Sequence, residues 1–277
     1  MSDDGVKIVA DHCNTVYMNG NGFGDIGQNI AEFRPELIGV DGREEFIELV
    51  EQAHEQGLTE RKSDGLGYIL ANNSNIGLER IIEEGVGAQR PEDYAEGFIR
   101  VCDENFDVHV ITAGIDEIAE RSMNARMNGY TPHVTGTSLA QNGSGVEVDS
   151  YCAGNEKLHA LRDHYEVESL ADKDIIAFGN SDSNDGPMME EAPIAIGRER
   201  AYDSADIYVQ DDPEFWTRAT LTGIASEILD GDNPKDRGLK FAMENPGHLE
   251  DIESGGNPGE YAEEVLEAYQ DVRREVM

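Results

Sequence analysis

Four stretches of the sequence place reactive side chains where strands are expected to end or a helix to begin. Asp11 and Thr112 each follow a short apolar run, and Lys157 comes near the start of an expected helix. A third apolar run ends at Gly179, where a stretch rich in Asp, Asn and Ser begins. A carboxylate can act as a nucleophile, hydroxyl and ammonium groups stabilise negative charge, and Mg²⁺ prefers oxygen ligands. These residue types suit nucleophilic chemistry assisted by a divalent cation.

Short buried strands are expected to alternate with helices along the chain. Apolar runs of three or four residues, typical of strands buried on both faces, occur at 7–10, 108–111, 175–178, 194–196 and 207–209. Strands separated by helices predict an α/β fold with a Rossmann-like parallel sheet. Ligands of such sheets bind at the carboxyl ends of the strands, where Asp11, Thr112 and Gly179 are expected.

The segment 23–90 is expected to form a mostly helical insertion after the first strand. Phe46, Leu49, Val50 and Ala53 recur at helical spacing within it. We therefore predict a discontinuous core, a helical cap and a C-terminal extension of loop and helix, with the boundaries 1–22 and 91–230 for the core, 23–90 for the cap and 231–277 for the extension.

Further elements are expected after the insertion. The turn 141–144, between two apolar stretches, predicts a hairpin, and a helix is expected to start near Asn155. Apolar spacing also predicts helices that begin at Pro91, near Ile115 and at Pro213, and a last one near the C-terminus. The segment 231–259 is rich in Gly, Pro, Asn and Asp and predicts a loop.

The order of these motifs resembles that of the haloacid dehalogenase superfamily, and within it the phosphoserine-phosphatase-like branch. That superfamily carries Asp-x-Asp-x-Thr after its first strand, Ser or Thr after a second, then a Lys, and Gly-Asp-x(3–4)-Asp, often with Pro-Met, after a further strand. The resemblance covers the chain from Val6 to about Gly197. It rests on Asp11, Thr15, Thr112, Lys157 and the run Asp185-Gly186-Pro187-Met188, of which the last is the most specific.

The resemblance implies a Mg²⁺-dependent phosphomonoester hydrolase that forms an aspartyl-phosphate on Asp11. Thr112 would donate a hydrogen bond to a phosphoryl oxygen, and Lys157 would neutralise the charge that develops on phosphate and nucleophile. The implied Mg²⁺ ligands are Asp11, the backbone carbonyl of Cys13 and residues of the fourth motif, where Asn180, Asp182 and Asp185 are the candidates.

Two positions depart from the family pattern. Cys13 stands where the family has the acid that protonates the leaving oxygen, and a thiol with a pKa near 8.5 is a poor replacement. Asn180 stands at the first acid of the fourth motif, where it can offer a carbonyl oxygen but no charge. The scaffold is therefore expected to be intact while the catalytic groups are altered.

Each candidate residue also has an ordinary structural interpretation. Asp11 can cap a turn, Lys157 and Asp182 can belong to the solvated surface, and Cys13 can fill a small buried space. His12 can replace the missing acid or base. Adjacent strand residues point to opposite faces, however, so His12 is expected to point away from Asp11. The other histidines lack a metal-ligand spacing, and the arginines and lysine of the expected cap are interpreted as surface residues.

Composition narrows the class of protein. Hydrophobic residues make up 38% of the 277, enough for a core, whereas 58 acids against 21 basic residues give a net charge of −37. The sequence shows no basic patch, so a nucleic acid is not expected as a partner. No apolar stretch is long enough to span a bilayer. Three widely spaced cysteines and an acidic N-terminus favour a reducing cytoplasm. The many negative charges repel one another, and at about 1 M salt, where the Debye length is ~3 Å, this repulsion is screened. We therefore predict a salty host cytoplasm.

The leading functional expectation is hydrolysis of a small phosphorylated metabolite in the cytoplasm. The alternative is a catalytically weakened relative that binds a phosphorylated ligand or a protein partner without efficient turnover, as Cys13 and Asn180 suggest. A third option is dehalogenase chemistry with the same carboxylate nucleophile, which the Mg²⁺-type fourth motif disfavours.

Overall fold

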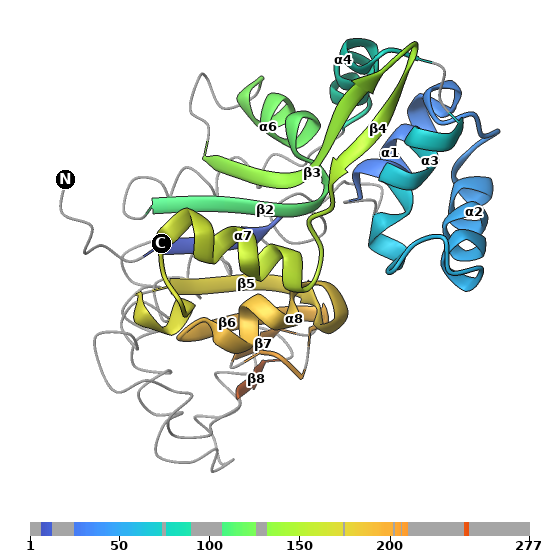
Figure 1. Ribbon diagram of the computed structural model, residues 1–277. Helices are drawn as coiled ribbons and strands as arrows, with labels where there is room; N and C mark the ends of the chain where they lie inside the picture. Colours follow the sequence, from blue (N-terminus) through green and yellow to red (C-terminus); the bar gives the residue numbers. More distant parts are fainter. Residues whose placement is uncertain are drawn as a thin grey trace, which may run out of the picture. The chain divides into compact units, whose positions relative to one another are not determined.

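The strands and helices form an α/β fold in a computed structural model of the chain (Figure 1). The structure describes residues 7–12, 25–73, 76–89, 107–125, 132–173, 175–201, 203–205, 207–209 and 241–243. The chain divides into two compact units. Unit 1 comprises residues 1–10, 97–108 and 161–277, and unit 2 comprises residues 11–96 and 109–160.

Unit 1 is built on parallel strands. They are β1 (Lys7–Asp11), β5 (Ile175–Ser181), β6 (Ile194–Arg200), β7 (Ile207–Val209) and β8 (Phe241–Met243). The last residue of β1, Asp11, is counted with unit 2. These strands pair in the order β1-β5-β6-β7-β8, with Ile8 opposite Ile176 and Ala177 opposite Ala195. Every residue of β1 and β5 is buried, which explains why both read as continuous apolar runs. The 3₁₀ helix η3 (Leu170–Asp172) precedes β5, and α8 (Asp182–Glu191) connects β5 to β6.

Unit 2 holds most of the helices that the structure describes. They are α1 (Ile26–Phe33), η1 (Pro35–Leu37), α2 (Arg43–Glu55), η2 (Lys62–Asp64), α3 (Gly65–Asn73), α4 (Leu78–Ala88), α6 (Asp116–Asn124) and the start of α7 (Asn155–Tyr165). Its strands are β2 (Asp107–Ile115), β3 (His133–Asn142) and β4 (Gly145–Ser150). β2 and β3 pair in parallel, and β3 and β4 form an antiparallel hairpin. The described residues between β1 and β2 thus form helices joined by short turns, with no strand among them.

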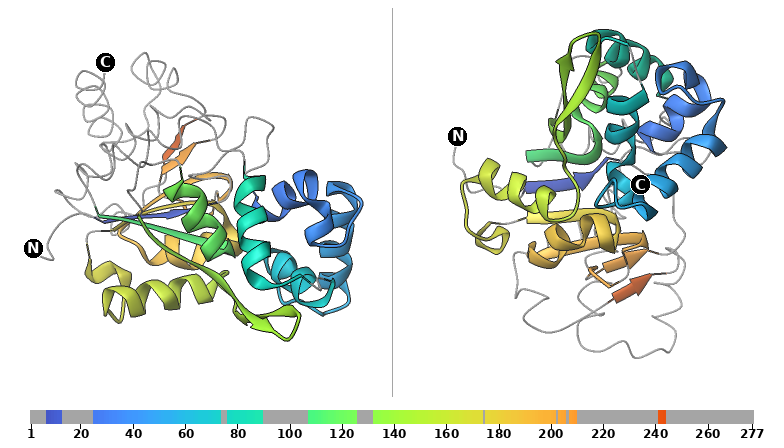
Figure 2. Two further views of the ribbon diagram at one scale, coloured as in Figure 1. Left: turned by 90° about the horizontal axis from the view of Figure 1, so that it is seen from above. Right: turned by 45° about the vertical axis from the view of Figure 1, so that its right-hand side comes forward.

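One hydrophobic core joins the inserted helices of unit 2 to its hairpin. Ile30, Leu70 and Ile82 from three inserted helices share this core with Ile118 of α6 and Val146 of β4. α3 packs against β4 and α4 packs against α6, as the two views of Figure 2 show. The helices therefore gain their stability from this shared apolar contact, because isolated helices of this length are marginal in water.

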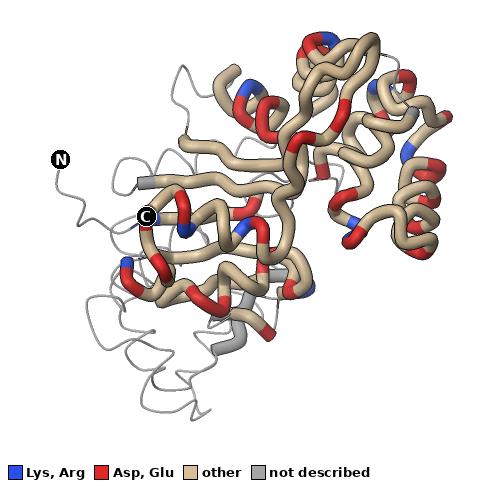
Figure 3. The backbone as a smooth tube through the Cα atoms, viewed as in Figure 1, with Lys and Arg blue, Asp and Glu red and all other residues tan. Residues whose placement is uncertain are grey.

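Acidic residues are distributed over helices and strands of both units (Figure 3). No single described segment collects them, in agreement with an acidic surface over an ordinary core. Among the described helices, none has the length and hydrophobicity needed to cross a membrane.

Most predicted strands and the hairpin are confirmed, and two predictions differ in extent. β2 continues past Thr112 to Ile115, so Thr112 lies inside the strand instead of after it. The segment 231–259 was predicted as loop, which is wrong for Phe241–Met243, because these three residues pair with β7. The predicted helices at 91–102, 213–229 and 261–272 lie outside the described residues. The predicted domain boundaries remain a prediction, because residues 13–24, 90–106 and 210–240 around them are also outside.

Candidate active site

Asp11 and Lys157 form a buried ion pair in unit 2. Asp11 is the last residue of β1, and Lys157 lies in the first turn of α7. Lys157 Nζ donates to Asp11 Oδ1 at 2.5 Å, while the lysine is 0% and the aspartate 1% exposed. Charged side chains are almost never fully buried unless they are paired, so the two groups depend on each other. The pair joins the first and third motifs of the sequence.

The loop before α7 fixes the position of Lys157. Gly154 has φ of 58°, a left-handed conformation that a residue with a side chain rarely adopts. Cys152, Ala153 and Gly154 are all buried, and Cys152 N donates to Thr137 Oγ1 at 3.2 Å. The lysine therefore starts from a backbone that is anchored to β3.

Arg61, from the inserted helices, braces the same loop. Its Nη1 donates to Glu156 Oε2 at 2.8 Å, and its guanidinium lies over Gly154, where a Cβ atom would be 2.8 Å from Nε. Asp64 holds Arg61 in turn, because Asp64 Oδ2 accepts the Arg61 backbone N–H at 2.9 Å. The left-handed φ of Gly154 favours glycine, and a side chain there would also displace the Arg61 guanidinium.

Thr112 is buried at an irregular point of β2. The register shifts between Ile111 and Ile115, and Thr112 Oγ1 accepts the N–H of Gly114 at 3.0 Å. A Cβ atom at Gly136 would lie 2.7 Å from Thr112 Cγ2, so the neighbouring strand leaves room only for glycine. Such irregularities re-aim side chains and are common beside active sites.

The surroundings of the ion pair favour neutral forms of nearby groups. Burial, and to a lesser extent the charge of Lys157, lower the pKa of His12 to about 3. Its imidazole is therefore neutral near pH 7 and cannot act there as a proton donor in the charged form. Burial also raises the pKa of the Cys152 thiol to about 12, although Lys157 opposes this shift.

The fourth motif lies in unit 1, where β5 passes into α8. Asp185 is fully buried, and its Oδ2 accepts the backbone N–H groups of Asn180 at 2.9 Å and Ser181 at 3.1 Å. A Cβ atom at Gly179 would lie 2.6 Å from Asp185 Cβ, so glycine is required before the turn. Asp185 and Asn180 are thereby held together where β5 passes into α8.

Asp182 accepts hydrogen bonds from a different part of the chain than Asp185 does. Its Oδ1 accepts the N–H of Ser204 at 2.8 Å, and its Oδ2 accepts that of Asp203 at 3.2 Å. Both carboxylate oxygens are used to hold the turn after β6, which favours a structural role for this residue.

The candidate ligands fit Mg²⁺ in their chemistry. Asp11 in unit 2 and Asp185 in unit 1 carry carboxylates, and Asn180 carries an amide oxygen, all hard donors of the type that Mg²⁺ prefers. Cys13, the remaining predicted ligand and catalytic position, lies outside the described residues.

Two features of unit 2 were not predicted from the sequence. Arg61 was interpreted as a surface residue, and no local pattern links it to Glu156, which lies 95 positions later. His109 and His133 lack a metal-ligand spacing along the chain, yet they face each other in the register of β2 and β3. Only a correct pairing of the two strands would have brought these histidines together.

Comparison with known proteins supports the fold. No family model and no curated protein matches the sequence. The structure is similar to phosphoserine phosphatase from T. onnurineus, with a TM-score of 0.50, 17% identity, and coverage of 83% of this chain and 96% of that one. It is also similar to a phospho-aspartyl intermediate analogue of phosphoserine phosphatase, with a TM-score of 0.50, 20% identity, and coverage of 74% and 93%. A haloacid dehalogenase family hydrolase from Salmonella enterica gives a TM-score of 0.51 at 16% identity, with coverage of 71% and 63%.

These similarities define the class of fold. The chain has the haloacid dehalogenase-like fold of the phosphoserine-phosphatase kind: a Rossmann-like α/β core with an inserted, mostly helical segment. The predicted fold class is confirmed.

Proposed function

We propose that this protein is a Mg²⁺-dependent phosphomonoester hydrolase that acts on a small phosphorylated metabolite through an aspartyl-phosphate on Asp11. The observation that carries the proposal is the buried contact of 2.5 Å between Asp11 and Lys157 at the end of β1. A buried pair adds little to stability compared with apolar side chains of similar size, so its presence favours a functional role.

The chemistry assigned to these residues is an exchange at phosphorus. A carboxylate oxygen of Asp11 bonds to phosphorus while the bond to the leaving alcohol oxygen breaks, and water then releases phosphate from Asp11. Lys157 holds Asp11 Oδ1 and offsets negative charge on the phosphoryl group, and Thr112 donates a hydrogen bond to it. Bound Mg²⁺ would neutralise phosphoryl oxygens, and Asp11, Asn180 and Asp185 carry the oxygen ligands that the sequence motifs assign to it.

The departure at Cys13 affects protonation of the leaving alcohol. Cys13 replaces the family's second acid, and His12, with its pKa lowered to about 3, is neutral near pH 7. Loss of a general acid typically costs ~10²–10⁴-fold in rate. We therefore expect slow turnover of alkyl phosphates and faster turnover of aryl phosphates, whose leaving groups need no proton.

Cys13 and Asn180 also support a second candidate, a protein that binds a phosphorylated ligand without efficient turnover. Such a protein would be stabilised by its ligand, because a ligand that binds only the folded state shifts unfolding by mass action. The two candidates differ in whether phosphate is released.

A phosphate-release assay separates them. Wild type and Asp11→Asn are incubated in high potassium chloride with alkyl and aryl phosphomonoesters, with Mg²⁺ or with a chelator. The proposal predicts release that requires both Mg²⁺ and Asp11. Absence of release from folded wild-type protein, together with a higher melting temperature in the presence of a phosphomonoester, would replace it with the binding function.

A further inference from the structure

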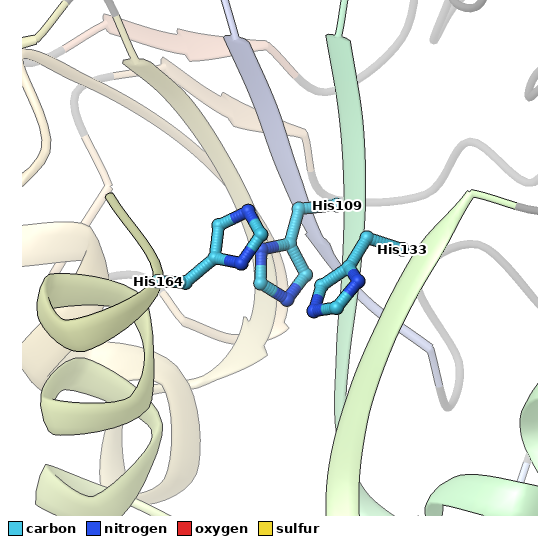
Figure 4. Close-up of side chains that lie close together, drawn as sticks. All are labelled: His109, His133 and His164. Carbon is cyan, nitrogen blue, oxygen red and sulfur yellow. The ribbon is translucent and has the colours of Figure 1, made fainter. Parts of the chain in front are cut away.

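His109 and His133 meet at the beginning of two neighbouring parallel strands. They are register partners on β2 and β3, so their side chains leave the sheet at the same level. Figure 4 shows the two rings close together, and their centroids are 4.6 Å apart at an interplanar angle of 82°. The pair lies in the amino-terminal part of the strands, whereas the proposed reaction belongs to their carboxyl ends.

The two imidazoles converge on one hydroxyl group. His109 Nε2 lies 2.9 Å and His133 Nε2 lies 3.4 Å from Thr135 Oγ1. The metal-binding nitrogens of the two rings lie within 4.8 Å of each other. Two ligands at ~2.0–2.1 Å from one tetrahedral ion are about 3.3 Å apart, so a small rotation of the rings suffices.

Burial gives the pair one fixed and one accessible member. His109 is 1% exposed and is held by the strand, whereas His133 is exposed. A dissolved ion can therefore reach His133 from solvent and be held against the fixed ring of His109. The net charge of −37 raises the concentration of cations near the protein surface.

We propose that His109 and His133 together bind a borderline divalent transition-metal ion such as Zn²⁺, Ni²⁺ or Cu²⁺, with water completing the coordination. Imidazole nitrogen suits these ions, whereas Mg²⁺ prefers oxygen. The ion takes the place between the two nitrogens that the Thr135 hydroxyl now holds. This site goes beyond the proposed hydrolase function and does not depend on it.

The experiment is a Zn²⁺ titration of the full chain in the presence of excess Mg²⁺, which occupies the acidic surface. Binding is followed by competition with a zinc-sensitive dye, and the histidine imidazole resonances are followed by NMR. His133→Ala is the main variant because an exposed side chain can be removed without loss of the core. His159→Ala, which removes an exposed histidine of α7, is the matched control.

The proposal predicts one ion per chain, shifted resonances of His109 and His133, and unchanged affinity in His159→Ala. His133→Ala should weaken binding by at least about tenfold, since even outer-shell partners of metal ligands are worth ~10–100-fold. Thr135→Val should retain the ion, because the hydroxyl is not a required ligand. Equal affinity in wild type and His133→Ala, or no Zn²⁺ binding above the Mg²⁺ background, would overturn the proposal and leave a hydrogen-bonded His–Thr–His group.

Discussion

Lys157 Nζ lies 2.5 Å from Asp11 Oδ1 although the two residues are 146 positions apart and neither is more than 1% exposed. Transfer of either charge out of water costs several kcal/mol, which mutual attraction offsets only while both partners are present. Each partner of this pair therefore depends on the other.

Replacement of Lys157 by methionine should be severely destabilising. The substitution leaves Asp11 as an unpaired buried carboxylate, so the free energy of unfolding should fall by about 3–5 kcal/mol in chemical denaturation. Lys62→Met is the control: Lys62 pairs with Glu51 at 2.9 Å on the surface, and its loss should cost under about 1 kcal/mol. Similar losses in the two variants would mean that the buried pair has no special energetic role.

The double variant Asp11→Asn, Lys157→Met should be more stable than Lys157→Met alone. Removal of both charges abolishes the unpaired group, so most of the lost unfolding free energy should return. Phosphatase activity should stay absent, because the proposed nucleophile is gone. Recovery of activity together with stability would contradict the assignment of Asp11.

Arg61→Ala should lower turnover more than stability. Without the contacts to Glu156 and Gly154, the loop that carries Lys157 is less fixed, and displacement of a catalytic group by about 1 Å can cost ~10²-fold. We expect kcat to fall by about 10–100-fold with a small change in melting temperature. Arg80→Ala, which removes an exposed ion pair with Glu84, should change neither quantity. Equal kcat in the two variants would show that Arg61 is not a positioning residue.

Asp182 and Asp185 should differ in their effect on the Mg²⁺ requirement. Asp185→Asn removes a buried carboxylate that accepts two backbone N–H groups, so we expect a loss of ~1–3 kcal/mol and a higher half-saturating Mg²⁺ concentration. Asp182→Asn should leave the Mg²⁺ dependence unchanged, because its oxygens hold the backbone of Asp203 and Ser204. Mg²⁺ titrations of activity for both variants provide the comparison, and the reverse order would reassign the ligand.

Cys152 should resist alkylation in the folded protein. Burial raises the pKa of its thiol to about 12, so the reactive thiolate is scarce at about pH 8.5, and unfolding restores the usual pKa near 8.5. The folded pKa lies above the unfolded one, so the stabilising contribution is complete below about pH 8.5 and is lost as the pH rises toward 12. Peptide mapping after iodoacetamide treatment should find Cys152 unmodified before denaturation and modified afterwards. Modification of native protein at pH 8 would contradict this environment.

The elements that were predictable are those with strong local patterns. β1 and β5 are buried on both faces and appear as continuous apolar runs, and the hairpin turns at Gly143, whose φ is 60°. β8 was missed because three residues carry no periodicity, and its pairing with β7 is a tertiary contact.

The candidate site was predictable only as an ordered set of motifs. The sequence predicts Asp11 at the end of a strand and Lys157 near the start of a helix. Their direct contact depends on the fold. The support from Arg61 and the meeting of His109 with His133 depend on register and on the packing of the inserted helices. Contacts between residues so distant in sequence leave no local signal, which is why they were not predicted.

Direct detection of a phosphorylated Asp11 shows whether this carboxylate is the nucleophile. Wild-type protein is mixed with an aryl phosphate and Mg²⁺, quenched in acid within the first turnover, digested and analysed by mass spectrometry. We predict a phosphate group, labile to hydroxylamine, on the peptide that contains Asp11, and none in Asp11→Asn. Phosphate release from wild type without any modified Asp11 peptide, or equal release by Asp11→Asn, would contradict Asp11 as the nucleophile.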